Sequence, residues 1–152
     1  MFQTYYKSEI GWIEIKGNED AIISVLFVDA PNKEEINPVL ESCKQQVQEY
    51  FEGTRRTFTV PLSAKGTEFQ TGVWDALKTI PYGETASYSD IATKIGNPKA
   101  VRAIGNANSK NPISILVPCH RIIGKNRALV GYAGGLWRKK WLLTHEQKKQ
   151  GN

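Results

Sequence analysis

A cysteine followed directly by a histidine, Cys119-His120, is the pair in this chain best suited to nucleophilic chemistry. A free thiol of ordinary pKa is only about 3% thiolate at neutral pH, so a nucleophilic cysteine needs help from an imidazole, a cation or peptide N–H groups. Neighbouring side chains in extended backbone point in opposite directions, so direct contact between the two requires a bend, or else a bridging water. The alternative is that Cys119 is a buried structural thiol.

Glu146 is the carboxylate that completes this constellation. It follows Leu142 by four residues and Leu143 by three, on or beside the apolar stripe of an expected helix. A carboxylate there is costly unless it is hydrogen-bonded. It can hold His120 in one tautomer and stabilise its imidazolium, which gives a Cys–His–Glu relay. The alternative is a frayed terminal helix with Glu146 in solvent.

The remaining cysteine and histidine content argues against a metal site. Two histidines and two distant cysteines contain no Cys-x-x-Cys or His-x-x-x-His spacing. We therefore expect no metal, and the absence of a G-x-G-x-x-G motif or a phosphate loop predicts no nucleotide cofactor. Cys43 lies on the apolar stripe of an expected helix and is predicted to be a buried hydrophobe.

The sequence patterns around these residues predict an α+β fold with two domains, residues 1–63 and 64–152. In the first domain, β-branched and aromatic runs predict strands over 5–6, 11–15, 22–28 and 57–62, and a helical period predicts a helix over 38–53. The second domain is expected to be mostly helical, with helices over 68–79, near 88–95, over 98–108 and over 136–149. A strand over 113–117 leads to Cys119, and residues 122–123 are expected to pair with residues 128–130.

Two short helices around Gly96 form a helix-turn-helix pattern. Ser87 or Ser89 can cap the first helix, and Asn97-Pro98 can start the second. On the second helix Ala100, Val101 and Ile104 form the predicted apolar side. A shared polar face is predicted at spacings of three, four and three residues: Lys99, Arg102, Asn106 and Ser109. The alternative for this face is simple solvation.

The last helix is expected to carry Glu146. It is predicted to bury Trp137, Trp141 and Leu142 and to turn four basic side chains, Arg138, Lys139, Lys148 and Lys149, towards solvent.

Charge is distributed unevenly along the chain. The net charge of +5 divides into −5 for residues 1–77 and +10 for residues 78–152. A cationic half suggests a polyanion, most simply nucleic acid, although such asymmetry can also serve solubility alone. No run approaches the roughly 18 apolar residues of a membrane-spanning helix, and the N-terminus lacks a signal-peptide pattern, so a cytoplasmic protein is expected, without a membrane partner.

Longer runs surround the candidate residues. Pro118-Cys119-His120-Arg121 follows Asn111-Pro112-Ile113-Ser114-Ile115-Leu116-Val117. Downstream are Gly131-Tyr132-Ala133-Gly134-Gly135-Leu136 and Trp141-Leu142-Leu143-Thr144-His145-Glu146. Upstream are Phe69-Gln70, Val73-Trp74, Pro81-Tyr82-Gly83-Glu84, Ser87-Tyr88 and Pro98-Lys99-Ala100-Val101-Arg102-Ala103-Ile104-Gly105. In these motifs the chain resembles the O6-alkylguanine-DNA alkyltransferase family over residues 66 to 149. The first 63 residues resemble its variable N-terminal domain only loosely.

The resemblance implies direct-reversal DNA repair, in which Cys119 accepts an alkyl group from O6-alkylguanine in double-stranded DNA. In this family the cysteine is activated through water by the residue matching His120, which the residue matching Glu146 orients. Asn111 would brace the turn that presents the cysteine. Tyr88 would lie beside the substrate and donate the proton that guanine needs as it leaves. The thioether has no route back, so the protein would act once, without a cofactor, and as a monomer.

The resemblance also implies how DNA is held. Arg102 would fill the gap in the base stack when the damaged nucleotide rotates out, approaching from the minor groove. We assign Lys99, Asn106 and Arg121 to DNA binding as well.

A substrate-binding segment is implied by the same resemblance, with Tyr132, Ala133 and Gly134 closing over the flipped base. Serine is common in the family where Ala133 stands, so a side-chain hydrogen bond to the base is in question while the backbone donor remains. Arg127 occupies a turn where the family often has glycine, and it adds a phosphate contact or simply changes the loop.

Two other classes of function fit part of the pattern. One is a DNA-binding module without activity, in which Cys119 is structural filler. The other is a Cys–His–Glu hydrolase such as a peptidase, which has no need for the slim basic helix.

Overall fold

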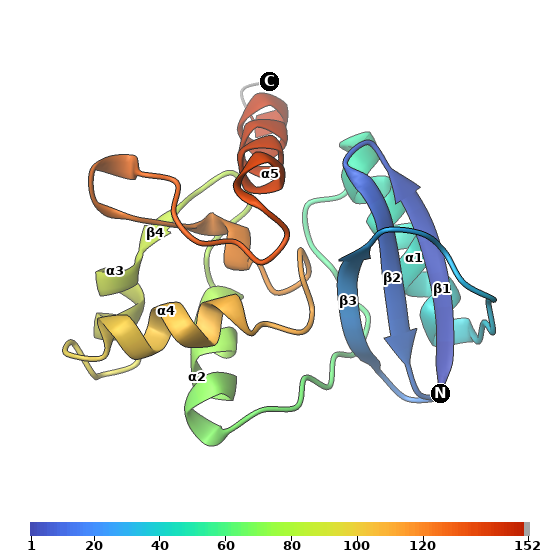
Figure 1. Ribbon diagram of the computed structural model, residues 1–152, viewed down its shortest axis with the longest axis horizontal. Helices are drawn as coiled ribbons and strands as arrows, with labels where there is room; N and C mark the ends of the chain where they lie inside the picture. The colour runs from blue at the N-terminus through green and yellow to red at the C-terminus, as the bar shows by residue number, and fades with distance from the viewer. Residues whose placement is uncertain (151–152) are drawn as a thin grey trace. The chain divides into compact units, whose positions relative to one another are not determined.

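Two units, Met1–Lys65 and Gly66–Asn152, make up the computed structural model (Figure 1). It describes residues 1–150, except for the side chains of Arg127, Lys149 and Gln150. The expected phosphate contact of Arg127 and the expected outward position of Lys149 therefore lie outside the described side chains. The division between Lys65 and Gly66 falls two residues beyond the boundary expected from the sequence.

The N-terminal unit is a sheet covered on one face by a helix. Strands β1 (Phe2–Ser8), β2 (Gly11–Gly17) and β3 (Ile22–Val28) pair antiparallel in that order. Helix α1 (Pro38–Glu52) lies against them, as Figure 1 shows. Its N-cap Asn37 accepts a hydrogen bond from the Leu40 amide at 2.9 Å, and Gly53 ends it in the left-handed region at φ 84°. The core forms where alternate strand residues meet the apolar stripe of the helix.

The strand expected over residues 57–62 is reduced to one isolated bridge between Ile22 and Leu62. Pro61 has no N–H to donate to a ladder. Upstream of it, the side chain of Gln46 takes the polar groups of Thr59: the Thr59 amide donates to Oε1 at 3.0 Å, and Nε2 donates to Oγ1 at 2.7 Å. A side chain on α1 has therefore replaced the neighbouring strand as the partner of this segment.

The C-terminal unit is mostly helical. Its helices are α2 (Glu68–Leu77), α3 (Tyr88–Lys94), α4 (Val101–Ser109) and α5 (Leu136–Gln150). Strands β4 (Ala86–Ser87) and β5 (Ile122–Ile123) pair in parallel. Helix α4 crosses α2, and the indole of Trp74 on α2 donates to the Ala107 carbonyl on α4 at 2.9 Å (Figure 1). The predicted α+β class, with a sheet-plus-helix unit followed by a helical one, is confirmed.

The start of helix α3 is set by a capping box, and the start of helix α4 is set by a turn. Ser87 and Asp90 form a reciprocal capping box, so α3 begins at Tyr88. The start expected for α4 at Asn97-Pro98 is wrong: the Ala100 amide donates to the Asn97 carbonyl at 3.0 Å, and the helix begins at Val101. Asn97 is restricted by the proline that follows it, which favours a turn at this point. Lys99 consequently lies in the turn before α4.

Pairing of β4 with β5 brings two chemically important segments together. Tyr88 follows β4 directly, and the 3₁₀ turn η1 (Cys119–Arg121) precedes β5 directly. The predicted pairing of residues 122–123 with 128–130 is wrong, because residues 122–123 form β5 and pair with β4 instead. One hydrogen bond of the expected kind remains, from the Gly124 amide to the Ala128 carbonyl at 2.8 Å.

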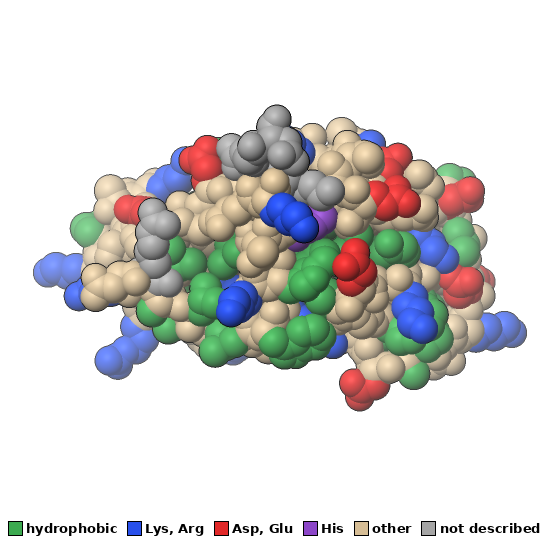
Figure 2. All heavy atoms as spheres, turned by 90° about the horizontal axis from the view of Figure 1, so that it is seen from above, with side chains coloured by type: hydrophobic (Ala, Val, Ile, Leu, Met, Phe, Trp, Pro, Cys, Tyr) green, Lys and Arg blue, Asp and Glu red, His purple; other side chains and the backbone are tan. Residues whose placement is uncertain are grey.

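Surface charge differs between the units. The N-terminal unit has 7 basic and 10 acidic residues, whereas the C-terminal unit has 13 basic and 5 acidic, a net charge of +8. Figure 2 shows that basic (blue) and acidic (red) side chains both reach the surface on the face drawn there. No helix within residues 1–150 is long and apolar enough to cross a membrane.

Candidate active site

The sulfur of Cys119 lies at the start of η1, immediately after a tight turn. Residues 113–117 were expected to form a strand, and that expectation is wrong. The Leu116 amide donates to the Ser114 carbonyl at 2.8 Å, and the Val117 amide donates to the Ile113 carbonyl at 3.0 Å. Ile115 adopts φ 72°, which is rare for a β-branched residue and marks local backbone strain. Cys119 is 5% exposed.

A buried asparagine holds this turn. Nδ2 of Asn111 donates to the Val117 carbonyl at 2.8 Å and to the Ile113 carbonyl at 3.3 Å, while Oδ1 accepts from the Ile113 amide at 3.0 Å. Asn108, on the buried side of α4, donates to the Cys119 carbonyl at 3.4 Å. Two asparagine side chains therefore fix the backbone on which the thiol is carried, which is the position implied for Asn111.

His120 and Glu146 form a fully buried pair. Nε2 of His120 and Oε2 of Glu146 are 2.6 Å apart, and both side chains are inaccessible to solvent. Burial opposes ionisation of Glu146, but His120 and Arg121 outweigh it and hold the pKa of the carboxyl well below its usual range. The Gly83 amide also donates to Oε1, at 3.3 Å. Glu146 is therefore an ionised, buried residue on α5 and not a solvated helix end.

Arg121 lies inside the protein. Its Nε donates to Oε1 of Glu146 at 2.8 Å and its Nη2 donates to Oε2 at 3.0 Å, the bidentate geometry of a strong charge-assisted pair. Nη1 donates to the Ile80 carbonyl at 2.7 Å. The DNA contact assigned to Arg121 from the sequence is corrected here, because a phosphate would have to displace a buried carboxylate. Arg121 instead positions Glu146.

The second imidazole nitrogen, Nδ1 of His120, is buried and has no hydrogen-bond partner among residues 1–150. Because Glu146 occupies Nε2, Nδ1 is the ring position left for proton transfer. A thiol and an imidazole on successive residues do not face each other directly in extended backbone, but η1 bends the chain between them.

Opposing effects act on the Cys119 thiol. Burial raises its pKa, while the Asn111 amide and the Lys139 ammonium lower it. Lys139 was expected to face solvent, and this expectation is wrong. Its side chain is buried, and Nζ donates to the Val130 carbonyl at 2.7 Å. Burial lowers the pKa of Lys139 from 10.5 to about 8.

The sequence contained a signal for Lys139 that was missed. It precedes Leu142 by three residues and Glu146 by seven, so it shares the buried face of α5. A lysine at that position is costly to bury, and its ammonium binds backbone carbonyls of the loop before Tyr132.

Two tyrosines complete the surroundings of the sulfur. Tyr88 begins α3, and its hydroxyl lies beside Gly131: a Cβ added there would come within 3.7 Å of it. Burial raises the pKa of Tyr88, and so does the negative charge of an ionised Cys119. The same two causes raise the pKa of Tyr132 well above its usual value. Both phenols therefore remain protonated, as hydrogen-bond donors require. Ala133 is exposed and Gly134 half-buried in the loop beyond.

The expected DNA-binding residues lie on the outer side of the helix-turn-helix. Arg102 and Asn106 are exposed on α4, and Lys99 is exposed in the turn before it. Ile104 and Asn108 occupy the opposite, buried side, where Asn108 reaches the Cys119 backbone. Val101, predicted to be buried, is instead 38% exposed beside Arg102.

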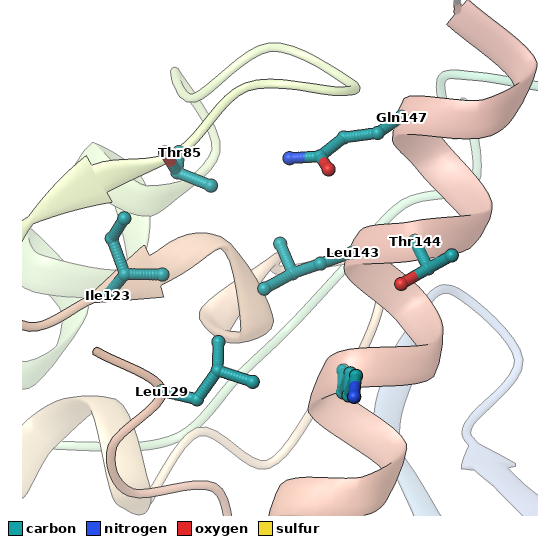
Figure 3. Close-up of a pocket in the computed structure, with 7 residues that line it drawn as sticks. Thr85, Ile123, Leu129, Leu143, Thr144 and Gln147 are labelled. Carbon is teal, nitrogen blue, oxygen red and sulfur yellow. The ribbon is translucent and has the colours of Figure 1, made fainter. Parts of the chain in front are cut away.

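A cavity of about 190 Å³ lies between α5 and the β4–β5 pair. Figure 3 shows Leu143 projecting from α5 towards Ile123 and Leu129, while Gln147 points towards Thr85. Cys119 is not among the lining residues. Within residues 1–150, no cluster of three or more histidine, cysteine, aspartate or glutamate side chains is arranged to hold a metal ion.

Comparison with family models matches both units. Residues 1–64 match the ribonuclease-like domain of 6-O-methylguanine DNA methyltransferase, and residues 68–148 match its DNA binding domain.

Curated relatives and solved structures agree with these models. The methylated-DNA–protein-cysteine methyltransferase of Methanosarcina acetivorans is 46% identical over 96% of this chain and 98% of its own length. The constitutive enzyme of Bacillus subtilis is 64% identical over 73% of this chain and 67% of its own. The crystal structure of Mycobacterium tuberculosis O6-methylguanine methyltransferase superposes with a TM-score of 0.88, at 40% identity, covering 97% of this chain and 93% of that one. A structure from the same organism in complex with DNA gives 0.90, at 40% identity, covering 98% and 94%.

Proposed function

Because the chain belongs to the methylated-DNA–protein-cysteine methyltransferase family, we propose that it repairs O6-alkylguanine in double-stranded DNA by moving the alkyl group to Cys119. The observation that carries this proposal is a thiol presented by a braced turn, followed directly by a histidine whose imidazole is hydrogen-bonded to the buried, ionised carboxylate of Glu146. A structural cysteine needs no such pair.

The reaction begins with the thiol proton. It passes through a water molecule to Nδ1 of His120, and Glu146 stabilises the imidazolium through Nε2. The Lys139 ammonium stabilises the thiolate. Sulfur then attacks the alkyl carbon, the new S–C bond forms and the C–O6 bond breaks. Tyr88 donates its phenolic proton to the departing guanine and is reprotonated from the imidazolium, so guanine gains one proton and the thiol loses one.

The product is a thioether, and the protein therefore acts once. Its reversal needs a second nucleophile at the sulfur. Cys43 does not supply one: it is fully buried in the N-terminal unit, and burial raises its pKa to about 12. Repair is stoichiometric with protein.

The alkyl carbon of O6-alkylguanine is inside the duplex, so the nucleotide must rotate out. Extrusion costs a few kcal/mol, which contacts to the phosphates offset. Arg102 fills the vacated stack from the minor groove, while Lys99 and Asn106 hold the flanking backbone. Tyr132, Ala133 and Gly134 close over the base. Support comes from the exposure of the α4 residues, the net charge of +8 on their unit and the DNA complex of the Mycobacterium tuberculosis relative.

Intact-protein mass spectrometry after incubation with an O6-methylguanine duplex tests the proposal. We expect one methyl group per protein, located on Cys119 by peptide mapping. Cys43→Ser is the matched control and should still be methylated, whereas Cys119→Ser should not.

Tight binding of the lesion without a mass change would overturn the proposal in favour of a DNA-binding module. Repeated ester or peptide cleavage without methylation would overturn it in favour of a hydrolase.

A further inference from the structure

Trp137, in the first turn of α5, was expected to be buried, but it is 58% exposed. Its neighbour in sequence, Leu136, is 48% exposed. A tryptophan exposed to this extent next to an exposed leucine typically marks an interaction site.

The exposed indole is held in one orientation. Gly135 has φ 96°, and a Cβ added to it would lie 3.2 Å from Cδ1 and 3.3 Å from Nε1 of Trp137, so the ring lies against the Gly135 backbone. On the ring, the guanidinium carbon of Arg138 is 4.6 Å from the centroid. Arg138 is itself tied to the loop, since Nη1 donates to the Gly134 carbonyl at 2.9 Å. The aromatic face and the cation are therefore arranged before any partner binds.

The indole of Trp137 and the guanidinium of Arg138 together indicate the kind of partner that this surface binds. A flat apolar face beside a guanidinium matches one sugar–phosphate unit, with the deoxyribose on the ring and the phosphate on the cation. The unit carries a net charge of +8, which favours a polyanion and disfavours a second copy of the same surface. The pair is also continuous with Ala133 and Gly134, the segment proposed to cover the extruded base.

We propose that Trp137 and Arg138 form a second DNA contact, separate from α4, which binds the sugar–phosphate backbone of the damaged strand beside the extruded nucleotide. This inference rests on the proposed function. The two DNA contacts then have different roles. Arg102 on α4 fills the gap left in the base stack, and the Trp137–Arg138 pair binds the backbone of the strand that carries the lesion.

Fluorescence anisotropy with an O6-methylguanine duplex tests the inference. Trp137→Ala is expected to raise Kd about tenfold, a change within the range found when an aromatic residue that stacks on a nucleic-acid base is replaced by alanine. Trp137→Phe should recover part of the affinity. Since the indole is uncharged, Trp137→Ala should leave the slope of log Kd against log salt unchanged. Arg138→Gln should reduce that slope by about 0.9, as expected for one lost phosphate contact.

The matched control is Trp12→Ala in the N-terminal unit, where Lys7 lies 5.9 Å from the indole centroid in a comparable cation–aromatic pair. This variant should bind with the wild-type Kd. Thermal melting of each variant separates lost contacts from lost folding. If Trp137→Ala unfolds, the salt slope of Arg138→Gln still decides the question.

Equal affinity of Trp137→Ala and wild type, with Cys119 methylated normally, would overturn this inference and leave the proposed function standing. Absence of methyl transfer in the wild type would instead overturn the proposed function. Sedimentation and anionic-vesicle binding are measured in parallel. If Trp137→Ala abolished self-association or vesicle binding while duplex affinity was retained, the surface would belong to a second copy or a membrane, and the inference would be overturned.

Discussion

Nε2 of His120 and Oε2 of Glu146 are 2.6 Å apart in a region that solvent does not reach, although the residues are separated by 25 others in the chain. Arg121 and the Gly83 amide bind the same carboxylate. The carboxylate thus fixes the tautomer of the imidazole and is itself held rigidly by its other partners.

Glu146→Gln should therefore impair both chemistry and stability. The variant keeps the shape of the side chain but leaves Arg121 without its counter-charge, and breaking a buried pair in this way costs about 3–5 kcal/mol. The methyl-transfer rate should fall at least about a hundredfold, the usual size of an acid–base contribution. Stopped-flow transfer and urea unfolding measure the two effects. Glu84→Gln, an exposed neighbour in sequence to Gly83, is the control; equal effects from both variants would contradict the assignment.

Asn111→Ala should lower the stability of the protein and raise the pKa of the Cys119 thiol. The change removes the buried amide that binds Val117 and Ile113, with an expected loss of about 2–3 kcal/mol in the free energy of unfolding. It also removes one of the groups that lower the pKa of Cys119, so the pH at half-maximal iodoacetamide reactivity should rise. Asn97→Ala, in an exposed turn, should change neither quantity by a measurable amount. A variant with wild-type thiol reactivity across the pH range would refute the bracing role.

Lys139→Met should make the protein more stable near neutral pH. The folded-state pKa of about 8 lies below the ordinary 10.5, so between these values the unfolded chain binds the proton more tightly. The wild type therefore gains stability as pH rises through this window, and the advantage of the methionine variant, at most about 3 kcal/mol, should shrink. Urea unfolding in a Cys119→Ser background removes the titration of the thiol.

Lys140→Met, at an exposed neighbouring position, is the control for this series. A stability difference between wild type and Lys139→Met that stays constant with pH would show that the ammonium is not desolvated. With Cys119 present, the methionine variant should also shift thiol alkylation to higher pH, because the cation that faces the thiolate is gone.

Arg102→Ala should slow repair of duplex DNA far more than it slows reaction with free O6-benzylguanine. The free base needs no extrusion, so only the duplex reaction depends on a side chain that fills the stack. The ratio of the two rate constants is the quantity to measure, with Lys94→Ala on the exposed side of α3 as the control. Equal slowing of both reactions would remove Arg102 from the extrusion step.

Periodicity and local signals predicted most of the architecture. The helices around Cys43 and Trp74 and the helix carrying Glu146 follow from apolar spacing, and the start of α3 follows from the Ser87 cap. Periodicity did not predict the places where a side chain, in place of a neighbouring strand, hydrogen-bonds the backbone. Gln46 takes the place of a strand next to Thr59, and Asn111 turns an apolar run into a bend at Ile115.

In the candidate site, the sequence indicated Cys119, His120 and Glu146, but it misassigned two cations. Arg121 was expected to bind DNA and Lys139 to face solvent, whereas both are buried, which charged side chains seldom are without partners. Their partners are distant in the sequence: Arg121 binds Glu146 and the Ile80 carbonyl, and Lys139 binds the Val130 carbonyl. Trp137 was misassigned in the opposite sense, since helical spacing alone does not distinguish a covered indole from one presented to a partner.

Arg121 and the Gly83 amide, which bind the carboxylate of Glu146, lie in the same unit as Cys119, His120 and Glu146 itself. The hydrogen bonds that orient the imidazole are therefore formed within the helical unit. A substitution elsewhere in the chain should leave these bonds in place, provided that the helical unit still folds.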